Sequence, residues 1–185
     1  MNKNRIWLVI PTACLPYFLL CTLSVVFFST QHPLCRFIME RVFAGNGLLL
    51  IASVLIFTFL AASMSVICFF ISIRKQWDAL SLAKTAMIIK LLQIPAYVII
   101  FIMGVILLTT ILAIPISFVL FLVECLTLVL TGLFTTAAAV VAVRKQMVTW
   151  KECGLLVGLQ LVFCADVVAS ILLYSILKKR TSSEV

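Results

Sequence analysis

Charged residues are scarce in this sequence. They make up 11% of its 185 residues, whereas 65% are hydrophobic and the mean hydropathy is +1.31. A soluble domain carries roughly 25% charged residues, because its surface must face water. The composition therefore excludes an ordinary soluble protein and predicts an all-α, polytopic transmembrane helical bundle whose solvent is the lipid bilayer. We expect residues 1–185 to form a single membrane domain.

The residues that carry most enzyme and metal chemistry are also few. The chain has one histidine, His32, and its seven cysteines include no CxxC pair. Structural zinc sites need several Cys and His ligands at short spacings, so we expect no metal site. Nothing in the sequence resembles a nucleophile with its base or a glycine-rich phosphate loop. We therefore expect no enzyme activity and no cofactor.

Acidic residues are outnumbered: 14 Lys and Arg face 6 Asp and Glu, which gives a net charge of +8. In a soluble protein this excess would suggest nucleic acid as a partner. Here the basic residues stand in small groups at the ends of apolar runs, such as Arg74-Lys75 and Arg144-Lys145. Such groups are typical of membrane borders, where they contact anionic lipid headgroups. We therefore expect the lipid bilayer, and no nucleic acid, as a partner.

Long apolar runs are abundant. They predict transmembrane spans at about 6–29, 48–73, 86–110, 116–143 and 154–177, and a short interfacial helix at about 34–43. The first run is longer than the apolar part of a signal peptide and lacks a convincing cleavage site, so we interpret it as an uncleaved signal anchor. Pro11 and Pro16 should kink this helix, and the carbonyls they leave free need other hydrogen-bond donors.

The third and fourth spans are separated by a length argument. The 53 residues between Lys90 and Arg144 include Glu124 as their one charged residue. A single helix of this length would extend about 80 Å, whereas the hydrocarbon core is about 30 Å thick. The stretch must cross twice, and Ala113-Ile-Pro115 is the natural turn.

The fifth run, 154–177, contains Asp166 near its middle. Its fourteen Leu, Ile, Val and Phe residues should still outweigh the carboxylate, which costs about 2.5 to 3.5 kcal/mol at a membrane centre. With five crossings and a cytoplasmic N-terminus, the loops and termini place eight Lys and Arg inside and five outside the cell membrane. This bias favours a cytoplasmic N-terminus, because Lys and Arg are enriched in cytoplasmic loops (the positive-inside rule). The basic cluster 178–180 then lies on the outer side, against this rule.

Four polar residues inside the predicted spans form the candidate site: Lys90, Gln93, Glu124 and Asp166. Ionisable groups in hydrocarbon are costly and mark functional sites by default. On five continuous spans, Glu124 and Asp166 would share a depth, where they could share a proton or coordinate a cation, with Lys90 as an alternative counter-ion. A structural buried network is the competing interpretation of the same residues. Gln160 is expected to point away from Asp166.

The segments Trp77-Asp-Ala-Leu-Ser-Leu-Ala-Lys84, Lys90-Leu-Leu-Gln-Ile-Pro-Ala-Tyr97 and Phe163-Cys-Ala-Asp166-Val-Val resemble a family of bacterial multi-pass membrane proteins of unknown function. The resemblance covers the C-terminal two-thirds of the chain. It implies a bacterial cell membrane and supplies no activity and no site residue.

Three functions remain open. Short loops and small-residue helix faces favour a structural or accessory subunit, working as a homo-oligomer or with a partner membrane protein. The intramembrane carboxylates favour a small proton- or cation-coupled transporter or a channel subunit. A protein that protects its cell against a membrane-active peptide would also fit the size.

Overall fold

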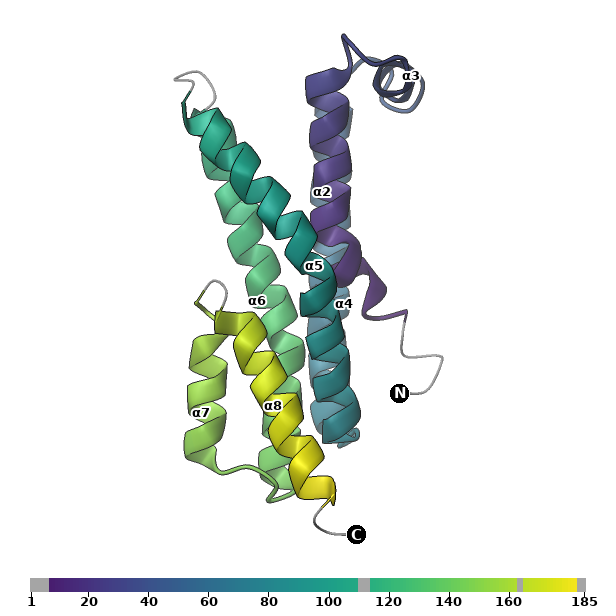
Figure 1. The fold of residues 1–185 in the computed structure, drawn as a ribbon. Coiled ribbons are helices and arrows are strands. Elements are labelled where there is room, and N and C mark those ends of the chain that lie inside the picture. Colours follow the sequence, from purple (N-terminus) through teal and green to yellow (C-terminus); the bar gives the residue numbers. More distant parts are fainter. Residues whose placement is uncertain (1–6, 110–113, 163–164, 183–185) are drawn as a thin grey trace.

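The computed structural model describes residues 7–109, 114–162 and 165–182. In this part of the chain it has helices and no strands, which confirms the predicted all-α fold (Figure 1). The seven helices are α2 (Ile10–Phe28), α3 (Pro33–Arg41), α4 (Gly47–Arg74), α5 (Ala79–Leu108), α6 (Ile114–Arg144), α7 (Trp150–Leu159) and α8 (Ala165–Ser182).

Four of these helices, α2, α4, α5 and α6, are long and apolar enough to cross a membrane. They correspond to the first four predicted spans. Helix α5 begins earlier than expected, because the Asp78 side chain caps it by accepting a hydrogen bond from the Ser81 amide at 2.9 Å. Residues 79–84, which lie between the second and third predicted spans, are therefore helical.

The turn between the third and fourth spans lies close to where it was predicted. Helix α5 ends at Leu108 and α6 begins at Ile114, so the 53-residue stretch is divided into two helices. The expected turn residue Ala113 lies outside the described residues. Helices α5 and α6 pack against one another along their lengths.

The predicted fifth span is not one continuous helix. The run 154–177 is divided between α7 and α8, which form an antiparallel hairpin beside one half of α6 (Figure 1). Neither helix is among those long and apolar enough to cross. Gly154 and Gly158 weaken α7 as a helix, and the break places Asp166 in the first turn of α8, where a helix N-terminus favours negative charge.

Helix α3 confirms the short helix predicted at 34–43, and all its residues are at least partly exposed. It lies at the end of the bundle opposite the α7–α8 hairpin (Figure 1). The guanidinium of Arg36 donates to the Thr30 carbonyl at 2.9 Å, which ties α3 to the chain that follows α2. Its position in a membrane interface stays a prediction.

The largest hydrophobic core lies where the hairpin meets α5 and α6. Small residues dominate the contact faces, because alanine permits close approach of two helices. The fully buried members include Ala83, Ala86, Ala138, Ala142 and Ala169. Leu173 and Leu177 of α8 are also fully buried there, so the hairpin is an integral part of the bundle.

Candidate functional site

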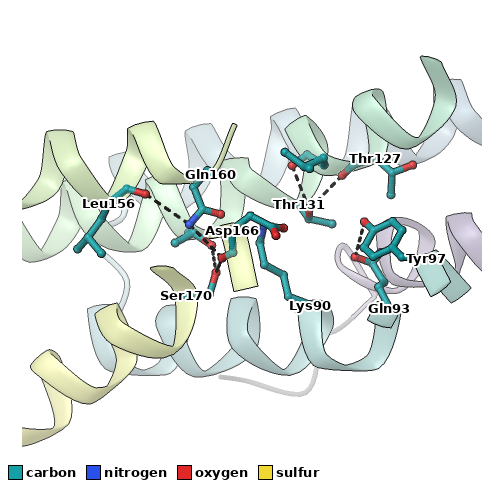
Figure 2. Close-up of polar contacts among 11 residues, drawn as sticks. Lys90, Gln93, Tyr97, Thr127, Thr131, Leu156, Gln160, Asp166 and Ser170 are labelled. Atoms are coloured by element: carbon teal, nitrogen blue, oxygen red, sulfur yellow. Dashed lines mark hydrogen bonds and ion pairs between the residues drawn. The ribbon is translucent and has the colours of Figure 1, made fainter. Parts of the chain in front are cut away.

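Two of the predicted site residues form a buried ion pair. The Lys90 ammonium of α5 lies 2.6 Å from Asp166 Oδ2 of α8, and their side chains are only 1% and 4% exposed (Figure 2). Both groups are thus removed from water and from lipid. A buried charge needs a partner of opposite sign, and each residue supplies it for the other.

The pair sits near the middle of the bundle. Lys90 is eleven residues from the start of α5, about 16 Å along a helix axis. Asp166 is the second residue of α8, so its carboxylate lies near the positive end of that helix. The ion pair therefore joins α5 to the end of the hairpin at which α8 begins.

Further hydrogen bonds fix the same end of α8. The Ser170 hydroxyl donates to the Asp166 carbonyl at 2.9 Å and lies 3.0 Å from the Thr135 hydroxyl of α6. The Gln160 amide nitrogen, at the end of α7, lies 3.4 Å from the same carbonyl (Figure 2). The expectation that Gln160 points away from Asp166 is wrong, because it assumed one continuous helix through both residues.

Gln93 lies one turn further along α5 and supplies a hydrogen bond that Pro16 removes from α2. Pro16 has no N–H, so the Thr12 carbonyl four residues earlier lacks its usual helical donor. The Gln93 amide nitrogen donates to that carbonyl at 2.8 Å, and its oxygen accepts from Tyr97 at 3.2 Å. The predicted need for an outside donor at the proline kink is confirmed.

A hydrogen bond in the opposite direction also joins α2 to α5. Pro95 lies within α5, and the Tyr17 hydroxyl of α2 donates to the Leu92 carbonyl three residues before it. The Thr12 hydroxyl lies 2.6 Å from the hydroxyl of Ser65 in α4. Helices α2, α4 and α5 are thus joined by polar contacts.

Glu124 does not join the ion pair. The Thr135–Ser170 contact sets the register of α6 and α8, and from it Glu124 lies about 10 Å further along α6 than Asp166. The equal depth expected for the two carboxylates does not hold, because it rested on a continuous fifth helix. Glu124 Oε1 is buried and has no hydrogen-bond partner among the described residues.

The base of the hairpin carries a second polar cluster. Thr149 and Glu152 form a capping box at the start of α7, and Arg180 of α8 lies 3.0 Å from Glu152 and also donates to the Met147 carbonyl. The hydrogen bond from the Thr149 backbone, and then that from Arg180, lowers the pKa of Glu152. These contacts hold the open ends of α7 and α8 together.

Sequence reasoning missed the roles of several polar residues. Thr12 was detectable, because it stands four residues before Pro16 and must lose its helical donor. Gln160 and Arg180 were not, since their contacts depend on the reversal between α7 and α8. Thr127, Thr131 and Thr135 share the inward face of α6, and all three are 1% exposed.

The residues of the site pair opposite charges and form hydrogen bonds. Among the described residues, no three His, Cys, Asp or Glu side chains are grouped to hold a metal ion. Comparison with known proteins adds no relative: no family model, no curated protein and no solved structure matches the chain. The resemblance to a bacterial membrane protein family therefore stays a prediction.

Proposed function

We propose that the chain is a multi-pass protein of the cell membrane, with four crossings and one hairpin, α7–α8, that enters the bilayer and returns to the same side. Returning the hairpin puts the basic cluster 178–180 on the same side as the N-terminus. Eleven of the 14 Lys and Arg then lie inside, two lie outside and Lys90 lies within the membrane. This distribution follows the positive-inside rule far better than five crossings do.

Within that topology, the function best supported is that of a structural or accessory membrane subunit. The observation that carries it is the closed Lys90–Asp166 pair, with side chains 1% and 4% exposed. Charges that carry an ion or a proton need access to water, whereas a dry pair fixes one element against another. The pair acts as a lock that holds the hairpin against α5. Work as a homo-oligomer or with a partner membrane protein, in a bacterial cell membrane, is part of this proposal.

Reporter fusions test the topology. Green fluorescent protein folds in the cytoplasm, whereas alkaline phosphatase is active only outside it. We expect both fusion points that flank the hairpin, after Gln146 and after Val185, to give fluorescent and phosphatase-inactive proteins, while phosphatase inserted at Asn46 is active. Opposite results at Gln146 and Val185 would show that the last segment crosses.

A second candidate function is proton- or cation-coupled transport. It is favoured by the helix break at the membrane centre, since carriers place ion sites at the ends of discontinuous helices. Purified protein in liposomes, loaded with a pH probe or a cation probe, separates the two functions. A structural subunit gives the same leak as empty liposomes under any gradient. A gradient-driven flux that Asp166→Asn abolishes would favour the carrier.

A further inference from the structure

A groove runs between α5 and α6 on the side that the hairpin covers only in part. We call it the α5–α6 groove. It consists of two adjoining hollows of about 430 and 320 Å³ that share Phe101. Ile94 and Leu108 mark its ends on α5, and Glu124 and Leu128 line it on α6. Asp166, at the end of the hairpin, closes one end.

The groove has the length of a helix contact. Fourteen residues separate Ile94 from Leu108, which corresponds to about 21 Å along α5. Residues 94, 98, 101, 105 and 108 line it at the spacing of one helix face. Large side chains border it and are well exposed, with Phe101 at 60% and Phe121 at 59%. Such a surface packs readily against the face of another helix.

Glu124 is the charged residue that α6 contributes to this largely apolar groove. Its Oε1 is buried without a hydrogen-bond partner in the described part of the chain. It lies ten residues, or about 15 Å, from the start of α6, well below the depth of lipid headgroups. A lipid acyl chain offers no donor to this carboxylate, and a headgroup ammonium would have to leave the interface to reach it.

A second copy of the chain does not supply the missing charge. In the described helices, the basic side chain at the membrane centre is Lys90, which is 1% exposed and bound to Asp166. A partner of different sequence could bring this cation to Glu124. Charged partners in the membrane face one another or a polar cavity, since lipid does not solvate them.

We propose that the α5–α6 groove binds a transmembrane helix of a partner protein, which carries one Lys or Arg that pairs with Glu124. The apolar walls provide packing, and the charge pair sets the depth and register of the bound helix. The proposal rests on the accessory role put forward above and names the chemistry of the partner. It assigns Glu124 a role separate from the Lys90–Asp166 lock.

Designed peptides test this surface directly. The probe is a 21-residue Leu-Ala transmembrane helix with one central Lys, and the matched control has Leu at that position. Energy transfer between labelled peptide and the full chain in liposomes gives the two dissociation constants. We expect the Lys helix to bind at least about tenfold more tightly than the Leu helix, and Glu124→Gln to remove this preference. Equal binding of the two peptides, or an unchanged preference in Glu124→Gln, would overturn the proposal.

Two further variants locate the contact. Gly104 lines the groove, and a Cβ placed there meets only Ser117 Oγ at 3.8 Å, so Gly104→Trp should fill the groove without breaking the fold. It should abolish binding of the Lys helix, whereas Ile102→Trp, outside the groove, should not. Energy transfer between two differently labelled copies of the full chain, lost in Gly104→Trp, would instead identify a second copy as the occupant. Reporter fusions on the same variants test the hairpin separately, so the two proposals can fail independently.

Discussion

Removing one member of the Lys90–Asp166 pair should be far more damaging than removing both. Lys90→Met leaves Asp166 buried without a counter-ion, and Asp166→Val leaves Lys90 in the same state. At an effective dielectric constant of about 20, charges 2.6 Å apart attract one another by about 6 kcal/mol. The desolvation of two charges offsets most of this attraction. We expect each single change to lower the free energy of unfolding by about 3 to 5 kcal/mol, the usual cost of a broken buried pair.

The double variant Lys90→Met, Asp166→Val separates a charge lock from ordinary packing. It replaces both charges by apolar groups of similar size, and such replacements are often neutral or stabilising. We therefore expect its free energy of unfolding to lie within about 2 kcal/mol of the original value. Simple addition of the single effects would instead give a loss of about 6 to 10 kcal/mol.

Unfolding in mixed micelles by sodium dodecyl sulfate, followed by circular dichroism, measures all four proteins. Lys84→Met is the matched control, because Lys84 is exposed on the same helix and should change stability by less than about 0.5 kcal/mol. Additive losses in the double variant would refute the lock. So would single variants as stable as the control, since the two charges would then be solvated or neutral.

Three smaller predictions concern other contacts, and the same unfolding assay measures them. Gln93→Leu should lower the free energy of unfolding by about 1 to 3 kcal/mol, because it leaves the Thr12 carbonyl without a hydrogen bond. The loss should be much smaller in a Pro16→Ala background, which restores the helical N–H donor to that carbonyl. Equal losses in both backgrounds would contradict this role of Gln93. Gly132→Leu should cost about 1 to 3 kcal/mol, because a Cβ there already meets the hairpin at 3.5 Å, whereas Gly154→Leu points into open space and should be tolerated. Because the pKa of Glu152 is lowered in the folded protein, its carboxylate stabilises the fold at pH values above the ordinary pKa of 4.5. This stabilisation is lost as the pH falls through the folded pKa, so Glu152→Gln should flatten the decline in stability on the acid side. An unchanged acid profile in that variant would exclude Glu152 as its source.

The long helices could be predicted because their signal is local. A run of apolar residues, its length and its basic ends are enough to place α4 and α6 within about two residues. The start of α5 was missed because it depends on one capping side chain, Asp78, within a stretch whose charges suggested a loop. A helix cap is a single hydrogen bond, and the average hydropathy of a segment does not reveal it.

The site could be predicted only in part, because its geometry depends on contacts between distant segments. Lys90, Gln93 and Asp166 were identified only from the free-energy cost of placing a polar group in hydrocarbon, which a structural or functional role must offset. Which residues meet could not be derived that way. Lys90 and Asp166 are 76 positions apart, and in the structure they meet where the last apolar run reverses direction. Once that reversal is known, Gln160 and Ser170 follow as neighbours of Asp166.

The reversal itself shows what a summed insertion energy leaves out for the last run. That sum treats a helix alone in lipid, where fourteen apolar residues outweigh one aspartate at about 2.5 to 3.5 kcal/mol. It leaves out Lys90, which carries a similar cost of its own on α5. Two unpaired charges would cost about 5 to 7 kcal/mol, and a hairpin that brings Asp166 to Lys90 removes most of both costs at once. The partner charge on α5 thus favours a break at this position, which the hydropathy of the run alone does not predict.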